Sequence, residues 1–439
     1  MLFNDKINEK IIENRQILLL NKFKEKIKRL KKKDIDISLS ALCYGCTWYD
    51  NLSLYSLKDL YLNNWKSKFI LFYFFLKGLP EIATIDNFNI KSMKSKQKFN
   101  NLILTWGKQS DFYKYTGFKD RYLGNKSSEN KKKLTIIFAT EKIKHIKLFT
   151  NEILFFNNHK KNKYFLLLKT LLKLLLDSNF SFYKFYNYAN FYSMFSILVL
   201  NKITAIIIKN DIKKISIPYE GQPFQDYLIK NLKINFPKIK ITGYVHATQP
   251  LPLHLINKDN SIDKMIVSSH DQFYHMHKRL DWPTHKLSIK KNIKIDRIDK
   301  FKYINKIFLP YGVNDPILLA RNFEILVKKN LFNTDKLIVK NHPAMTDSHK
   351  HKILSAKINK IILENKNKLS VSKSSFCILI GATSSVPEAF QSVKEIYHIY
   401  QDGIIETYAK YFWPNIDILS INDHIVKYKT INKEKLFLI

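Results

Sequence analysis

Arginine is scarce in this chain of 439 residues, although lysine is abundant. Arginine occurs only at Arg15, Arg29, Arg121, Arg279, Arg297 and Arg321. Lysine and arginine together number 74 against 37 acidic residues, which gives a formal net charge of +37 at pH 7. Proteins that read nucleic acids depend mostly on arginine, because its planar guanidinium pairs with phosphates and base edges at two points. We therefore expect anionic partners such as phosphorylated sugars or an anionic membrane surface, and no nucleic acid.

Cysteine is also rare, with three in the chain. Cys43 and Cys46 have Cys-x-x-Cys spacing, but no second pair exists to complete a zinc site. Histidines gather at His270, His275, His277 and His285. No Asp-x-Asp element follows a predicted strand to hold a metal-bound nucleotide. The sequence therefore predicts no metal and no disulfide.

Two apolar runs stand out in the pattern, and both fall short of a membrane span. The run from Phe69 to Leu76 is too short to span a bilayer, and Lys169 and Lys173 interrupt the leucine-rich stretch from Tyr164 to Leu176. A spanning helix needs about 20 apolar residues. Charged residues stand among the first ten, which is not the pattern of a signal peptide. We expect a cytoplasmic protein that can associate peripherally with the inner membrane.

Strand and helix patterns alternate along the chain, which indicates an α/β fold. In the first part, strands are predicted over 35–42, 101–107, 134–139, 214–218, 239–245 and 265–267, and helices over 5–33, 165–180 and 223–232. After a basic stretch from 286 to 306, our candidate linker, strands are predicted over 307–310, 337–339 and 376–380, and a helix over 315–329. The sequence therefore predicts two Rossmann-like doubly wound domains, residues 1–295 and 296–439, which face each other across a cleft.

His342 and Pro343 directly follow the strand predicted over 337–339. Proline ends the strand and fixes the turn. A histidine at the carboxyl end of a parallel strand can donate hydrogen bonds to a phosphate or a leaving group. Gly312 lies in the turn after the preceding strand, at the same expected edge of the sheet. These residues predict a nucleotide-binding site, and a loop histidine without function is the alternative.

Thr383, Ser384 and Ser385 follow the apolar strand predicted over 376–380 and begin a helix. Their hydroxyls and the free N–H groups of a helix start predict a phosphate site. Glu388 lies one turn into that helix, where its carboxylate can accept hydrogen bonds from ribose hydroxyls. An ordinary serine N-cap and a carboxylate that favours the helix dipole are the alternatives.

A His-Pro motif followed by a Ser-Ser motif at a strand-to-helix turn resembles the bacterial sialyltransferases, polysialyltransferases and Kdo transferases, which share the GT-B glycosyltransferase architecture. The resemblance implies that His342 supports the departing CMP and that Ser384 and Ser385 bind its phosphate. It implies a ribose role for Glu388, although Ser392 stands where that element often has glycine. It further implies inverting, metal-independent transfer without a cofactor, from a CMP-activated nucleotide-sugar to a glycan or glycolipid acceptor of capsule or lipopolysaccharide biosynthesis.

The same families carry an acidic pair before a glycine in the first domain, and one of these carboxylates is the general base. Here Tyr219-Glu220-Gly221 supplies only one acid, so the resemblance implies that Glu220 takes the proton of the acceptor hydroxyl. His246, which ends the strand predicted over 239–245, is the second candidate for the base or for an acceptor ligand. A glutamate at a helix entry is the structural alternative.

Lys108, Asp120 and Arg121 follow the strand predicted over 101–107 and can bind an acidic acceptor, with a solvated charged loop as the alternative. Other readings of the whole chain stay open. The same fold can use CDP-glycerol or a UDP- or GDP-sugar, or can bind CMP without turnover. A basic, non-catalytic protein that binds nucleic acid or anionic lipid would also explain the net charge.

Overall fold

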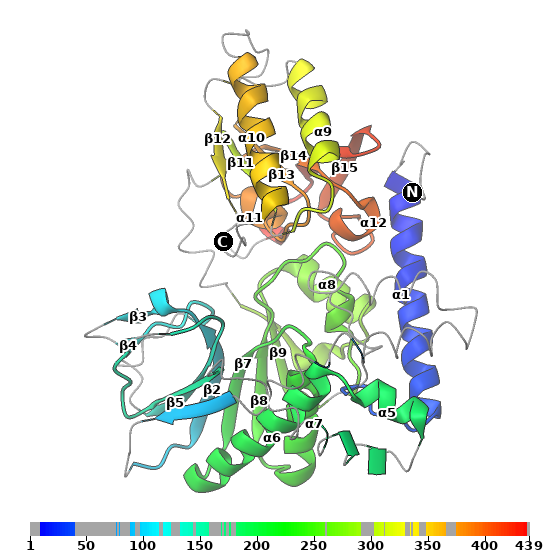
Figure 1. Ribbon diagram of the computed structural model, residues 1–439. Helices are drawn as coiled ribbons and strands as arrows, with labels where there is room; N and C mark the ends of the chain where they lie inside the picture. The colour runs from blue at the N-terminus through cyan, green and yellow to red at the C-terminus, as the bar shows by residue number, and fades with distance from the viewer. Residues whose placement is uncertain are drawn as a thin grey trace.

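The computed structural model describes residues 9–39, 76, 79, 88–92, 97–113, 117–123, 132–143, 146–157, 168, 171–172, 175–176, 181–259, 261–290, 303–310, 312–329, 334, 337–341, 348–365 and 375–436. Within these residues the chain forms two large sheets with helices packed on them, and a small two-stranded sheet (Figure 1). This arrangement confirms the predicted α/β class with two doubly wound domains.

The first sheet has eight strands in the order β1-β6-β5-β2-β7-β8-β9-β10. They are β1 (Phe88–Ser92), β2 (Asn101–Gly107), β5 (Lys133–Ala139), β6 (Glu152–Asn157), β7 (Lys214–Pro218), β8 (Lys240–Tyr244), β9 (Lys264–Val267) and β10 (Leu287–Ile289). Neighbouring strands are parallel except at the edge, where β1 runs antiparallel to β6. The chain adds β5 and β6 on one side of β2 and then crosses to β7 on the other. The neighbours β2 and β7 therefore flank the topological switch point, where doubly wound sheets bind their ligands.

The crossover from β6 to β7 contains α6 (Phe191–Asn210), which packs against α7 (Pro223–Asn235). Val199, Ile203 and Ile207 lie four residues apart and are buried, so one face of α6 covers the sheet. Among the described residues, α6 is the helix that has the length and composition to cross a membrane, and 33% of its apolar window is buried. Shorter elements of this domain are β3 (Phe112–Tyr113), β4 (Gly117–Phe118), α5 (Phe182–Tyr188) and α8 (His270–Lys278).

The second sheet has six strands in the order β12-β11-β13-β14-β16-β15. They are β11 (Lys306–Phe308), β12 (Ile338–Lys340), β13 (Phe376–Ile380), β14 (Glu395–Ile399), β15 (Ile416–Asn422) and β16 (Ile425–Thr430). The first four strands are parallel, and β16 and β15 extend the sheet in antiparallel fashion. The chain places β12 on one side of β11 and β13 on the other, so the switch point of this sheet lies between β11 and β13.

The second domain contains helices α9 (Pro316–Lys328), α10 (His349–Glu364), α11 (Val386–Ala389), α12 (Gly403–Glu406) and α13 (Lys433–Leu436). Of these, α9 packs on α10 and β14, whereas α13 contacts α8 of the first domain. The side chain of Asp315 accepts hydrogen bonds from the N–H groups of Ile317 and Leu318 and so starts α9, with Pro316 in its first turn. This is the helix start that the sequence predicts.

The N-terminal helix α1 (Glu9–Lys32) runs along both domains (Figure 1). The buried side chain of Gln16 donates hydrogen bonds to the carbonyls of Ile404 and Thr407 in the second domain, at 2.9 and 2.8 Å. Further along the helix, Lys24 pairs with Asp281 of the first domain at 2.7 Å. One continuous apolar cluster extends through both domains. The two domains are therefore held in a fixed relation by packing and by α1.

The structure corrects two sequence predictions. The strand predicted over 35–42 does not form at residues 35–39, where 37–39 form a turn because the Asp36 carboxylate accepts hydrogen bonds from the N–H and hydroxyl of Ser38. Residues 40–42 lie outside the described residues. The candidate linker is shorter than predicted, since Leu287–Ile289 pairs with β9 as strand β10. The predicted domain boundary at 295/296 lies outside the described residues, between the last strand of the first sheet and the first strand of the second.

Candidate active site at the two switch points

Glu220 lies two residues after β7, at the switch point of the first sheet. Its carboxylate accepts a hydrogen bond from His246 Nε2 at 2.8 Å through one oxygen and from Gln222 Nε2 at 2.6 Å through the other. The backbone N–H of Glu220 donates to the side chain of Gln225 at 2.9 Å. The side chains of Glu220 and His246 are 19% and 12% exposed, so the pair is sheltered yet reachable. The structure thus brings together the two residues that the sequence offered as rival bases.

The charge state of Glu220 follows from these contacts. Burial by itself raises the pKa of Glu220, but the charge of His246 and its hydrogen bond act in the opposite direction. Smaller contributions from His254 and Gln222 also lower it, and the net pKa lies below the usual value. Glu220 is therefore a carboxylate at neutral pH, which is the state that a general base requires.

Aromatic rings enclose the His246 side of this pair. The Tyr122 ring meets the His246 ring edge-on at 4.5 Å between centroids, and Trp106 at the end of β2 lies 6.2 Å from His246. Burial, followed by the charge of Glu220, raises the pKa of Tyr122 to about 12, so its hydroxyl stays protonated. Asp120 is buried beside them, and its carboxylate accepts the N–H groups of Tyr122 and Leu123. Burial raises the pKa of Asp120.

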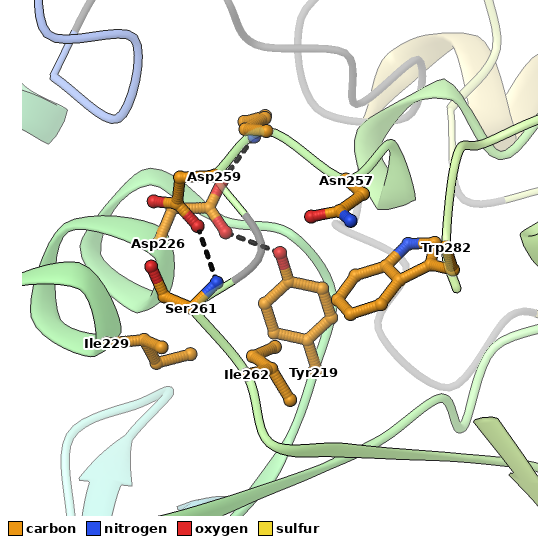
Figure 2. Close-up of a pocket in the computed structure, with 9 residues that line it drawn as sticks. Tyr219, Asp226, Ile229, Asn257, Asp259, Ser261, Ile262 and Trp282 are labelled. Carbon is orange, nitrogen blue, oxygen red and sulfur yellow. Dashed lines mark hydrogen bonds and ion pairs between the residues drawn. The ribbon is translucent and has the colours of Figure 1, made fainter. Parts of the chain in front are cut away.

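A buried network of hydrogen bonds and an ion pair around Asp226 holds the loop that carries Glu220 (Figure 2). The hydroxyl of Tyr219 and the ammonium of Lys258 both bind the Asp226 carboxylate at the start of α7. Lys258 also reaches the carbonyl of Gly221 at 3.4 Å. Gly221 has a φ of +62°, and a Cβ there would lie 2.0 Å from the carbonyl oxygen of His254, so only glycine fits. The residues on both sides of Glu220 are thus fixed.

Several buried polar atoms near this edge make no hydrogen bond within the described residues. They belong to His246, Gln249 and His254. A buried polar group without a partner costs about 1–3 kcal/mol, so such groups are usually satisfied by water or a ligand. This edge of the first sheet therefore holds buried polar atoms that lack hydrogen-bond partners, which is typical of a binding site.

At the second switch point, the turn after β13 is shaped by Gly381. It has a φ of +64°, and a Cβ would lie 2.8 Å from Pro310 in the turn after β11. The Thr383 hydroxyl accepts the N–H of Ser385 at 3.1 Å. Ser385 occupies the N-cap position of α11, but its side chain makes no capping hydrogen bond. The alternative that Ser385 is an ordinary N-cap is therefore not supported.

The two edges meet at this turn. The Thr248 hydroxyl, two residues after His246, donates a hydrogen bond to the carbonyl of Ser384. The hydroxyl of Tyr408 lies within hydrogen-bond distance of two carbonyls, those of Thr248 and, at 3.2 Å, Thr383. Its single hydrogen can serve one of them at a time. The structure therefore brings the Glu220–His246 loops and the Thr383–Ser385 turn into contact.

A buried chain of hydrogen bonds supports Tyr408 from behind. Its N–H donates to the Tyr428 hydroxyl at 3.2 Å, and that hydroxyl lies 3.1 Å from His398 Nδ1. His398 Nε2 lies 2.7 Å from the carbonyl of Gly381, which can only accept, so Nε2 carries the hydrogen. Burial lowers the pKa of His398 to about 4, so Nδ1 is free to accept from Tyr428. This chain fixes both ends of the Gly381 turn.

The other predicted residues of the second domain have different surroundings. Glu388 is buried and accepts a hydrogen bond from the Tyr303 hydroxyl at 3.0 Å, so its ribose role stays a prediction. Gly312 is exposed with open space around its Cα. His342 and Pro343 lie outside the described residues, although Asn341 before them follows β12 at the expected edge.

No group of three or more metal-ligand side chains occurs in the part of the chain that the structure describes. Of the clustered histidines, His275 is buried with Nδ1 at 3.1 Å from the Phe412 carbonyl, and burial lowers its pKa to about 4. His277 contacts the Trp282 carbonyl in the same way. Metal-independent chemistry stays a prediction.

Thr248, Gln222 and Tyr408 are the site residues that sequence reasoning missed. Gln222 directly follows the Tyr219-Glu220-Gly221 run, and a capping pattern at the start of α7 was the available signal. Thr248 and Tyr408 are separated by 160 positions, and no local pattern links them.

No family model matches the chain, and no curated protein matches it. Among solved structures, a glycosyltransferase from Rickettsia africae ESF-5 is similar over 71% of this chain and 86% of its own, with 12% identity and a TM-score of 0.31. The UDP-GlcNAc 2-epimerase from Neisseria meningitidis, bound to UDP-GlcNAc, is similar over 65% of this chain and 79% of its own, with 10% identity and a TM-score of 0.33. Likeness at this level assigns no activity, so the functional inference rests on the geometry of this chain's own site.

Proposed function

We propose that the protein is a nucleotide-sugar-dependent glycosyltransferase. The observation that carries the proposal is the contact between the carboxyl-end loops of the two sheets. The Thr248–Ser384 hydrogen bond joins the loop after β8, which also carries His246 and through it Glu220, to the Thr383–Ser385 turn. A transferase needs a base for the acceptor on one side and a cradle for the leaving phosphate on the other.

In the proposed reaction, Glu220 takes the proton of the acceptor hydroxyl as that oxygen attacks the anomeric carbon of the donor sugar. The hydrogen bond from His246 Nε2 orients the Glu220 carboxylate. The bond between the sugar and the nucleotide phosphate breaks, and the electron pair leaves with the phosphate. We assign Ser384, Ser385 and His342 to stabilise that charge. Attack from the face opposite the phosphate makes the reaction inverting.

The donor we propose is a CMP-activated ulosonic acid such as a sialic acid or Kdo, on the motif resemblance of His342-Pro343 and Ser384-Ser385. The acceptor would be a surface glycan or glycolipid. The competing assignment is a transferase of the same fold that uses CDP-glycerol or a UDP- or GDP-sugar as its donor. We propose no metal and no cofactor for the reaction.

A thermal-shift panel with CMP, CDP, UDP and GDP tests the donor, because a ligand that binds the native state raises its stability. We expect the largest rise with CMP or a CMP-sugar, and a shift with UDP alone would refute the CMP assignment. Transfer measured with and without EDTA tests the metal, and activity should survive the chelator. Retention of RNA at physiological salt without any nucleotide shift would favour the non-catalytic binding protein instead.

A further inference from the structure

A short helical segment between β6 and α5 exposes a row of leucines. Residues 168, 171–172 and 175–176 are helical, and Leu168, Leu172 and Leu176 are 58%, 53% and 59% exposed. Their spacing of four places them on one face, which we call the leucine face. Leu171 and Leu175 lie beside this face, are partly buried, and pack on the small core around Phe185, Ala189 and Met194. The segment is therefore apolar both toward the protein and toward solvent.

An exposed row of large apolar side chains needs an explanation. Soluble proteins scatter single exposed leucines, but contiguous apolar patches mark interaction sites. The part of the sequence around the leucine face, residues 158–210, has a single acidic residue, Asp177. Its lysines are Lys160, Lys161, Lys163, Lys169, Lys173, Lys184, Lys202 and Lys209. The partner of the leucine face therefore has apolar and anionic character together.

A second source of positive charge adjoins this region. A group of exposed basic residues lies at the end of helix α1 and directly after it. We call it the basic cluster: Lys28, Arg29, Lys32 and Lys33. The chain directly after it is tied to α5, since Asp34 pairs with Lys184 at 3.0 Å and the N–H of Asp36 donates to the Tyr188 hydroxyl at 2.7 Å. Figure 1 shows this end of α1 beside α5, at the base of the first domain and away from the second sheet.

We propose that the leucine face and the basic cluster together dock the protein on an anionic phospholipid membrane. Leucines on one helix face enter the boundary between headgroups and acyl chains, and neighbouring basic residues attract anionic headgroups. A partner protein would have to match both features, whereas an anionic bilayer offers them everywhere. The docking itself does not require catalysis. Its role rests on the proposed function, because docking would bring the transferase to a lipid-linked acceptor.

Sedimentation of the full chain with vesicles tests the proposal. The vesicles are phosphatidylcholine alone or phosphatidylcholine mixed with phosphatidylglycerol. We expect binding to the mixed vesicles that weakens with salt. The triple variant Leu168→Ser, Leu172→Ser, Leu176→Ser should reduce binding about tenfold or more, because three apolar side chains no longer leave water. The matched control replaces three exposed apolar residues of the second domain with serine, namely Ile317, Leu363 and Leu419, and should bind as the wild type does.

A second variant tests the electrostatic part without touching the leucines. Lys28→Gln with Lys32→Gln should lower binding to the mixed vesicles by about fivefold per residue removed and leave the weak binding to neutral vesicles unchanged. Thermal unfolding confirms that each variant is folded.

Three results would overturn the proposal. They are equal binding to both vesicle types, unchanged binding by the folded leucine variant, and a wild-type dimer in light scattering that the leucine variant converts to a monomer. The last result would make the leucine face an interface between copies. The vesicle result is independent of the nucleotide thermal-shift panel, so failure of the proposed function and failure of the docking surface are told apart.

Discussion

The hydroxyl of Thr248 donates a hydrogen bond to the carbonyl of Ser384, so the loop after β8 in the first domain touches the turn after β13 in the second. His246 precedes Thr248 by two residues, so a movement of the Ser384 turn can shift the loop that positions the Glu220–His246 pair. In the proposed reaction, this contact fixes the position of the general base relative to the turn that binds the donor phosphate.

Glu220→Gln should abolish transfer while donor binding persists. The substitution keeps the size of the side chain, leaves one of its two accepting oxygens and removes its basicity. Loss of general-base help costs about 10²–10⁴ in rate. Initial rates and the nucleotide thermal shift measure the two effects separately. If Glu220→Gln stays active and His246→Ala is inactive, the base is His246. If both variants keep full activity, the pair has no part in catalysis.

His342→Ala should lower the rate of transfer by about 100-fold, as the loss of one donor to a leaving phosphate does. The expectation comes from its position in the sequence directly after Asn341, which follows β12 at the same sheet edge as the Ser384 turn. Circular dichroism must show an intact fold before the rate is interpreted. A folded variant with near-normal turnover would remove His342 from the mechanism.

Tyr408→Phe should lower the free energy of unfolding by about 1–2 kcal/mol, because the carbonyls of Thr248 and Thr383 lose their shared donor. It should also raise the KM for the donor more than it lowers kcat. Tyr400 offers a matched control, since its hydroxyl is also buried but has no partner within the described residues.

Tyr400→Phe should leave stability unchanged or raise it. Denaturant unfolding of both variants gives the comparison. Equal losses from the two substitutions would mean that the Tyr408 hydrogen bonds contribute nothing specific.

We expect the free energy of unfolding to fall as the pH rises, because of the buried side chain of Glu406. Burial raises the pKa of Glu406 to about 8 in the folded protein, whereas the unfolded carboxyl has its ordinary value of 4.5. Between these values the folded state holds a proton that the unfolded chain lacks. The free energy of unfolding therefore decreases as pH rises through this window and levels off above about pH 8.

Glu406→Gln should flatten this decline, because the amide does not titrate. Melting temperatures measured between pH 5 and pH 9 check the prediction, with Glu324→Gln on exposed α9 as a control that should keep the wild-type slope. A wild-type slope in Glu406→Gln would show that other groups set the pH dependence.

Strong local patterns made much of the fold predictable from sequence. Strands β2, β7 and β13 match their predicted residues, because each is a short apolar run bounded by a turn. Helix α6 was missed because its apolar residues surround the helix and leave no amphipathic pattern. Strands β15 and β16 were missed because polar residues interrupt their alternation, so pairing with β14 decides their conformation.

The candidate site was predictable in part for the same reason. Glu220 and His246 each follow a recognisable strand, and the rule that ligands bind at the carboxyl ends of strands located both. Their direct hydrogen bond was not predictable, because it depends on loop conformations after two neighbouring strands. The Tyr408 contacts depend on the aromatic stretch after α12, which packs back on the first domain over a long sequence separation.

Helix α1 must wait for the end of the chain before it can complete its packing. Gln16 binds carbonyls that lie 388 and 391 positions later in the chain. During synthesis α1 leaves the ribosome before every other described element, yet α12 and β15, which it contacts, are among the last to be made. Contacts of such long range slow folding, and the apolar face of α1 stays unpaired until then. We therefore expect the apolar face of α1 to need protection from aggregation until the second domain is made.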